Sequence, residues 1–279
     1  MLYTSTRDAS KLYTFEEAIC VGYASDGGLF VPQNLPERID AATLKAWSTL
    51  NYIELATDVL ERFLSPEEVS RQELYDIIHA SLSGFPNPSH AVPVVPIPLN
   101  STARLEGNKN KALYVVELFH GPTFCFKDLS LQFVVHMLDY FSRKRNRQTT
   151  LIVSTTGDTG PAAVQAVNDL NSPYLSILVH YPQGQISDFQ RKQLTTCNSD
   201  RVLVAAFQGG GDDMDAPIKR IIQDGSFSRT NKRLVCGINS YNIARPLMQM
   251  IHFIWTYLRV VQQENIEPGN PGTFSICFR

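Results

Sequence analysis

The chain has 279 residues, which is enough for one large domain or two modest domains with a sizeable buried core. Its formal net charge is −2 and its isoelectric point is near 6.3, so no general basic surface is expected, which argues against nucleic acid as a partner. No stretch approaches the roughly 20 apolar residues that cross a bilayer, and the sequence therefore predicts no membrane partner.

The cysteines, the histidines and the first residues indicate the compartment and the absence of a metal site. The five cysteines are odd in number and never show C-x-x-C spacing, which argues against a disulfide framework and favours a reducing compartment. They are Cys20, Cys125, Cys197, Cys236 and Cys277. Residues 1–7 lack the apolar core of a signal peptide. We expect a cytoplasmic protein, with an organelle as the alternative, and no metal site, since the six histidines show no ligand spacing.

Residues 1–90 are predicted to form a helical N-terminal domain. The expected helices cover residues 15–20, 40–50, 52–63 and 65–82. The last of these is placed at Ser65 because this serine, a proline and two glutamates follow the favoured order of N-cap, proline and acidic first turn. Residues 26–32 are expected to form a glycine turn that leads into an extended apolar stretch.

A proline-rich and then polar stretch separates this domain from the rest of the chain. Residues 84–98 are rich in proline, and residues 100–111 are polar and weakly patterned, so we expect a linker or an exposed insertion at 91–112. Residues 113–279 are then predicted to form an α/β domain in which strands and helices alternate.

Lys127 is the first candidate for chemistry. Residues 113–118 are short, apolar and β-branched, which predicts a buried strand, and a glycine-proline pair then breaks the chain. Apolar residues recur at helical spacing from Phe126 to Phe141, so Lys127 lies in the first turn of a helix between aromatic residues. Burial and the helix dipole both favour its neutral amine, which attacks aldehydes and suits a Schiff base with pyridoxal phosphate. The alternative is a helix-end lysine that extends to solvent.

The turn at residues 155–160 is the second candidate. Residues 149–154 are predicted to form a strand, and residues 161–167 a helix with proline in its first turn. A turn of this kind at a helix N-terminus presents free backbone N–H groups, which makes a site for an anion. The alternative is an ordinary connection between a strand and a helix. We expect the Asp158 carboxylate to accept backbone N–H bonds that hold the turn, and to face away from the ligand.

The remaining elements indicate the fold class. Further strands are expected at residues 174–179, 202–207 and 234–238, and further helices at 186–195, 214–223 and 247–261. Repeated βα units predict an α/β fold, a parallel sheet covered by helices on both faces. Ligands in such sheets bind beyond the carboxyl ends of the strands, where Lys127 and the turn at 155–160 are both expected.

Both candidate stretches resemble the threonine synthase family, pyridoxal-phosphate enzymes with the tryptophan-synthase-β type of fold (fold type II). Residues 120–128 match the family motif H-G-P-T-x-x-F-K-D, and residues 155–160 match T-S-G-D-T-G with Thr156 in place of serine. Weaker matches in the same order are D-G-G-L-F-x-P at 26–32, Y-P-x-G-x-x-S at 181–187, G-x-x-D at 209–213 and N-S-x-N-x-x-R at 239–245.

The resemblance implies a role for each matched residue. Lys127 would hold pyridoxal phosphate and then move protons at Cα and Cβ of the substrate. The α-carboxylate of the substrate would bind to Thr155, Thr156, Gly157, Asp158, Thr159 and Gly160. The substrate phosphate would lie near Ser187, Asn239, Asn242 and Arg245. The implied reaction converts a small phosphorylated amino acid, O-phosphohomoserine, and water into threonine and phosphate. Threonine-synthase-like relatives are phospho-lyases that release a 2-oxo acid and ammonia instead.

The resemblance ends before the family's pattern does. Threonine synthases continue with a strand and a glycine-rich loop that wraps the cofactor phosphate, whereas residues 264–279 here hold only a turn at Gly269. We therefore expect a fold that is incomplete at the C-terminus, weak cofactor binding and no turnover by this chain alone. The alternative function is that of a shortened, non-catalytic form that acts through protein contacts, or of an incomplete gene product. The sequence predicts no particular oligomeric state.

Overall fold

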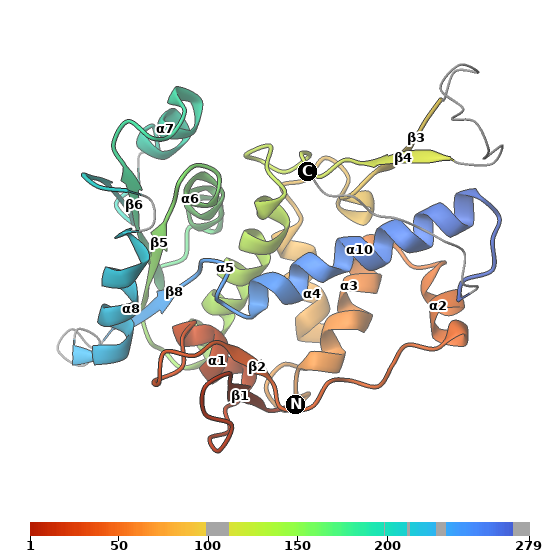
Figure 1. Cartoon of the computed structure of the whole chain (residues 1–279), viewed down its shortest axis with the longest axis horizontal. Coiled ribbons are helices and arrows are strands. Elements are labelled where there is room, and N and C mark those ends of the chain that lie inside the picture. Colours follow the sequence, from red (N-terminus) through yellow and green to blue (C-terminus); the bar gives the residue numbers. More distant parts are fainter. Residues whose placement is uncertain (99–111, 198, 211–212, 227–232, 270–279) are drawn as a thin grey trace.

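A four-stranded parallel sheet forms one side of the molecule. The computed structural model describes residues 1–98, 112–197, 199–210, 213–226 and 233–269. The strands of the sheet are β5 (Thr149–Ser154), β6 (Leu175–Pro182), β7 (Val202–Phe207) and β8 (Leu234–Gly237). They lie in the order β7-β6-β5-β8, and every neighbouring pair is parallel. In Figure 1 the sheet lies on the left, with its connecting helices around it.

Helices cover both faces of this sheet, as the repeated βα units predicted. The connecting helices are α5 (Lys127–Lys144), α6 (Thr159–Leu170), α7 (Asp188–Thr195) and α8 (Asp215–Asp224). Side chains alternate along β5, so Leu151 and Val153 join the main hydrophobic core with α5 and α6. Ile152 points to the other face and packs with Ile218 of α8 in a second, smaller cluster. The α/β fold class is therefore confirmed.

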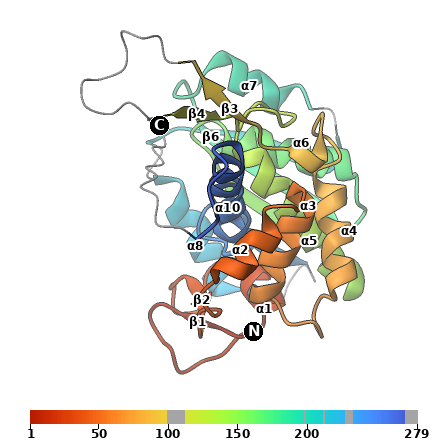
Figure 2. The ribbon, with the colours of Figure 1, turned by 90° about the vertical axis from the view of Figure 1, so that its right-hand side faces the viewer.

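The N-terminal part is helical, as predicted. Its helices are α1 (Phe15–Val21), α2 (Ala41–Trp47), α3 (Tyr52–Leu60) and α4 (Arg71–Ser81), with short 3₁₀ turns at Glu61–Phe63 and Pro88–His90. The small strands β1 (Tyr3–Ser5) and β2 (Phe30–Pro32) pair antiparallel beside α1. The long helix α10 (Ala244–Gln263) packs against both α3 and α5, and Figure 2 shows it next to α2 and α3.

One hydrophobic core joins the helical part to the sheet. It extends from Tyr3 through the interior of α3 and α5 to Leu258, and all of these helices contribute fully buried residues. Helix α1 packs on β8, and helix α4 packs on α5. The domain boundaries at residues 90 and 112 stay predictions, but the core itself runs across them. Among the described residues no helix is long and apolar enough to cross a membrane.

The predicted helix start at Ser65 is wrong. Residues 66–69 form a turn and a bend, and α4 begins only at Arg71. Ser70 is its N-cap, in a reciprocal capping box with Glu73, which satisfies two N–H groups at once. Glu68 is used elsewhere, because its carboxylate accepts the backbone N–H of Phe15 at 3.2 Å and that of Glu16 at 2.8 Å. An acidic residue expected in one first turn therefore stabilises the start of α1 instead.

The predicted buried strand at 113–118 is also wrong. The strand β4 (Leu113–Val116) is partly exposed and lies outside the parallel sheet, paired antiparallel with β3 (Val94–Ile97). Part of the expected linker is thus a strand, and its proline, Pro96, is tolerated because a two-stranded ribbon has free edges. Several expectations lie outside the described residues: the polar insertion at 99–111, the centre of the glycine cluster at 211–212 and the segment 270–279.

Candidate functional site

Asp128 organises the turn that places Lys127. Its carboxylate is fully buried and accepts the backbone N–H and the hydroxyl of Thr123 at 2.8 and 2.6 Å, as well as the N–H of Cys125 at 3.5 Å. Gly121 lies so close that a Cβ there would be 2.4 Å from the Asp128 carboxylate, which explains the glycine. The turn therefore ends in a fixed position, and α5 begins at Lys127 as predicted.

Phe124 occupies an unusual backbone conformation within this turn. Its φ is 62°, in the left-handed region that a bulky residue rarely adopts, and its side chain is 68 % exposed. Such strain is held in place by the surrounding hydrogen bonds and is typical of functional sites.

Lys127 is an ion-pair partner of Asp158. Its Nζ donates to Asp158 Oδ2 at 3.1 Å, lies 4.5 Å from the centre of the Phe126 ring and 4.0 Å from the Cys125 sulfur. The two charged side chains are 21 % and 43 % exposed, respectively, so the pair lies at the rim of the interior. Burial raises the pKa of the Cys125 thiol to about 11, so the thiol beside the lysine is neutral at physiological pH. The structure thus brings the two candidate stretches together.

The turn at 155–160 is held by Thr155. Its buried hydroxyl oxygen accepts the N–H of Gly157 at 3.1 Å and the N–H of Gly160 at 2.9 Å. The expectation that Asp158 would accept these backbone bonds is wrong, because its carboxylate points to Lys127 and to Gln190 instead. Thr155 performs the role that the sequence assigned to Asp158.

Replacing Thr155 by valine should loosen this turn. Valine keeps the shape but leaves the N–H groups of Gly157 and Gly160 without their acceptor, which should lower the free energy of unfolding by about 1–3 kcal/mol. Thr155→Ser keeps the oxygen and is the matched control, expected to lose less than half as much. Urea unfolding measures both, and equal losses would show that the methyl group rather than the oxygen stabilises the turn.

Asp158 has a second partner that the sequence did not single out. Gln190 in α7 donates from Nε2 to Asp158 Oδ1 at 2.6 Å. Burial opposes ionisation of this carboxyl, but the hydrogen bonds from Gln190 and Lys127 outweigh it and hold its pKa below the usual value. The carboxylate is therefore ionised at neutral pH and held between two donors.

Ser187 lies beside this network as the N-cap of α7. Its hydroxyl and backbone N–H both donate to Gln190 Oε1, at 2.9 and 3.1 Å. The hydroxyl predicted to face a substrate phosphate is thus engaged in a capping box.

Of the three predicted residues that follow β8, the side chains of the two asparagines bond to the backbone, whereas that of Arg245 does not, among the residues that the structure describes. Asn239 accepts the N–H of Ser154 at 3.2 Å and donates to its carbonyl at 2.7 Å, so it fastens the end of β5. Asn242 is fully buried and donates to the carbonyls of Ile19 and Gly237 at 2.8 and 3.0 Å. Both asparagines are therefore engaged with backbone groups.

Arg245 is different, because it keeps an unsatisfied atom. It is 3 % exposed, and its Nε has no hydrogen-bond partner among the described residues. Burial lowers its pKa to about 10. A buried cation with an unused donor is suited to hold an anion.

A depression of about 460 Å³ opens over this network. Its walls include Asp158, Ser187 and Gln190 from the sheet side and Thr123, Cys125 and Phe126 from the lysine turn. Sequence reasoning missed Gln190, Asp128 and Thr123. The usable signal for Gln190 was its place three residues after Ser187, where a capping box has its second member.

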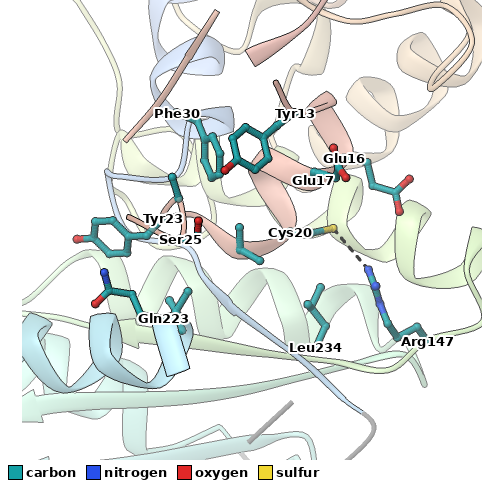
Figure 3. A pocket seen from close by; sticks show the side chains of 13 residues that line it. Tyr13, Glu16, Glu17, Cys20, Tyr23, Ser25, Phe30, Arg147, Gln223 and Leu234 are labelled. Carbon is teal, nitrogen blue, oxygen red and sulfur yellow. Dashed lines mark hydrogen bonds between the residues drawn. The ribbon is translucent and has the colours of Figure 1, made fainter. Parts of the chain in front are cut away.

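A second hollow, of about 360 Å³, lies elsewhere and contains none of the predicted site residues. Figure 3 shows its lining, with the rings of Tyr13 and Phe30 side by side, Tyr23 next to Gln223, and Arg147 hydrogen-bonded to Cys20. Arg147 donates to the Cys20 sulfur at 3.9 Å, and burial raises the pKa of that thiol to about 12. The Cys20 thiol is thus neutral at physiological pH.

The residues of the lysine site fit pyridoxal phosphate. A partly exposed lysine amine can reach an aldehyde, and at the same rim the N–H groups of Thr156, Asp158 and Thr159 remain for an anion, since those of Gly157 and Gly160 donate to Thr155. Lys127 would hold the cofactor, and the 155–160 turn would receive a carboxylate. The buried, partly unsatisfied Arg245 would serve a second anionic group.

Comparison with known proteins gives the family that the chain resembles. Residues 2–82 match the family model described as the threonine synthase N terminus. The chain is 35 % identical to threonine synthase-like 2 of Xenopus laevis over 96 % of its own length and 53 % of that protein. It is 36 % identical to threonine synthase of Saccharomyces cerevisiae over 92 % of its length and 49 % of that protein.

Solved structures show the same similarity. The yeast threonine synthase crystal structure superposes with a TM-score of 0.79 at 34 % identity, covering 95 % of this chain and 51 % of that one. The pyridoxal-phosphate-bound threonine synthase of Brucella melitensis gives 0.77 at 29 % identity, covering 97 % and 53 %. The chain thus spans about half the length of the relatives it matches.

Proposed function

Because the chain belongs to the threonine synthase family, we propose that it carries the lysine-bearing part of a pyridoxal-phosphate-dependent carbon–oxygen lyase acting on O-phosphohomoserine. The observation that carries the proposal is the position of Lys127, at the first residue of α5 and 3.1 Å from Asp158 in the turn before α6. Two motifs that are distant in sequence thus form one site at the carboxyl ends of the strands.

Different residues of this chain have different roles in the proposed reaction. The bound cofactor supplies an electron sink for a carbanion at the substrate Cα. Lys127 holds the cofactor and moves protons at Cα and Cβ, since its amine is the one basic side chain of the described site with partial solvent access. The α-carboxylate of the substrate binds to the N–H groups of Thr156, Asp158 and Thr159, because those of Thr155, Gly157 and Gly160 donate within the protein. Of the four residues expected near the substrate phosphate, Arg245 keeps an unused donor and is our candidate for that role.

The proposed reaction can give two alternative sets of products. In the first, O-phosphohomoserine and water give threonine and phosphate. In the second, the same reactants give 2-oxobutanoate, ammonia and phosphate. The second version is kept because threonine synthases and threonine-synthase-like proteins match this chain at the same level, 36 % identity.

The test is an assay of all four products with O-phosphohomoserine and pyridoxal phosphate, on a version extended by the C-terminal half of a relative because the chain alone is expected to show no turnover, with the Lys127→Ala variant as the control. We expect threonine and phosphate in equal amounts. 2-Oxobutanoate and ammonia in place of threonine would assign the phospho-lyase outcome. No product from wild-type protein that has bound the cofactor would overturn the enzymatic proposal and favour a non-catalytic role through protein contacts.

A further inference from the structure

We propose that Gln190 is a positioning residue that orients Asp158 toward Lys127. That Lys127, Asp158 and Gln190 belong to a catalytic site rests on the proposed function. The contacts among these three residues do not depend on it. Gln190 is the third residue of α7 and belongs to a capping box, in which its backbone N–H donates to the Ser187 hydroxyl at 3.2 Å.

The oxygen of the Gln190 side-chain amide is fixed by Ser187, and its nitrogen donates to Asp158. Its Oε1 accepts the N–H and the hydroxyl of Ser187 at 3.1 and 2.9 Å. Its Nε2 donates to Asp158 Oδ1 at 2.6 Å, and the other oxygen of Asp158 accepts from Lys127 at 3.1 Å. A single amide therefore connects the start of α7 to the start of α6 and, through Asp158, to the start of α5.

The chemistry of the amide distinguishes this capping box from the others. The described helices contain four capping boxes, and in the other three the third residue is a glutamate: Glu17, Glu54 and Glu73. A glutamate accepts the N–H of the cap as well as a glutamine does, but it has no N–H to donate. Only the box beside Lys127 has a side chain with both an acceptor and a donor, and its donor is the atom that contacts Asp158.

Gly157 leaves room for this contact. Its φ is +153°, and a Cβ on it would lie 2.6 Å from Gln190 Nε2. Any side chain at residue 157 would therefore displace the Gln190 amide from Asp158. The glycine of the turn thus has a local reason that is independent of the ligand.

The position of Gln190 determines which oxygen of Asp158 faces the lysine. Without a donor on Oδ1, the carboxylate can rotate, and Lys127 loses its oriented partner. When the Asp158 carboxylate is fixed, its hydrogen bond keeps the Lys127 amine in one orientation. A lysine that acts as an acid and a base needs such a fixed orientation. Gln190 lies in the wall of the depression, but its side-chain hydrogen bonds go to Ser187 and Asp158, so its effect on the lysine is indirect.

The test compares Gln190→Glu with Ser187→Ala. Glutamate keeps the capping box but replaces the donor by a second carboxylate next to Asp158. Alanine removes the cap hydroxyl but keeps the Ser187 backbone N–H that holds Oε1, so the Asp158 contact should survive. The readout is the pH titration of the Asp158 carboxyl carbon by ¹³C NMR on the full chain. Asp158→Asn identifies the signal by its loss.

We expect the apparent pKa of Asp158 to rise by about one pH unit or more in Gln190→Glu, because like charges disfavour ionisation, and to stay at its wild-type value in Ser187→Ala. Acetylation of Lys127, followed by mass spectrometry, should be faster in Gln190→Met, which has no polar atoms to orient Asp158. Gln190→Met also serves if the glutamate variant does not fold.

An unchanged Asp158 titration and an unchanged acetylation rate in the folded Gln190 variants would overturn the inference. Both readouts are made without cofactor or substrate. A failure of the enzymatic proposal in the product assay is therefore a separate result from a failure here.

Discussion

Replacing Lys127 by alanine is expected to abolish covalent retention of pyridoxal phosphate and, in a version extended by the C-terminal half of a relative, to lower the turnover of O-phosphohomoserine by about 10³-fold or more. The reason is that one amine performs two tasks, attachment of the cofactor aldehyde and proton transfer, and general acid–base catalysis alone contributes about 10²–10⁴-fold. The measurement is the absorbance of protein that has been incubated with the cofactor, reduced with borohydride and freed of unbound cofactor, followed by mass spectrometry of the labelled peptide.

Lys127→Arg is the matched control. Arginine keeps a cation beside Asp158, so the ion pair and the stability of the fold should be preserved. Its guanidinium stays protonated and cannot attack an aldehyde, so cofactor retention should be lost as completely as in the alanine variant. Borohydride attachment of the cofactor to a lysine other than Lys127 would contradict the assignment.

Replacing Asp128 by alanine should have the largest effect on stability, a loss of about 3–4 kcal/mol in the free energy of unfolding. The change leaves the N–H and the hydroxyl of Thr123 buried without their acceptor, and each such group costs about 1–3 kcal/mol. Chemical denaturation with urea measures the loss. Asp128→Asn is the matched control, since an amide can accept the Thr123 N–H and donate to its hydroxyl oxygen, and it should lose about 1 kcal/mol.

Asp128 should also give the stability a distinct pH dependence. Burial raises the pKa of its carboxyl above the usual value, although hydrogen bonds from Thr123 and Cys125 act in the opposite direction. The folded state therefore binds more protons than the unfolded state between the two pKa values, and stability falls as the pH rises through that interval. The stability of wild type minus that of Asp128→Asn should be greatest below the unfolded pKa, near 4, and should decline above it. A difference that rises with pH would contradict this sign.

Much of the fold could be predicted because local patterns and tertiary packing agree. The strands β5 and β7 have the bounds that their apolar runs indicate, and α5 begins at Lys127 as the break at Gly121 suggests. The failures are cases where a distant partner decides. Glu68 stabilises the start of α1, more than 50 residues away, and so the helix expected at Ser65 begins six residues later. No local pattern carries that information.

The sequence named Lys127 and the 155–160 turn, which the structure brings together, but it did not indicate how the side chains there are connected. Lys127 and the 155–160 turn were found because glycines, threonines and a lysine at helix starts have recognisable chemistry. The direction of the Asp158 carboxylate was not, because it depends on Gln190, which is 32 residues further along the chain. Asn242 shows the same limit, since a motif residue expected to face a ligand instead donates to a backbone carbonyl of α1.

The contact between Asn242 and Ile19 also orders events during synthesis of the chain. Helix α1 packs on β8, and its Ile19 carbonyl accepts from an asparagine that is 223 residues later in sequence. At about 5–20 residues per second, a ribosome needs roughly 10–45 s to produce that distance. During this time the face of α1 that packs on β8 has no native partner there, although its contacts with Glu68 and with α5 can already form. The contact between α1 and β8 is therefore among the last native contacts that the growing chain can make.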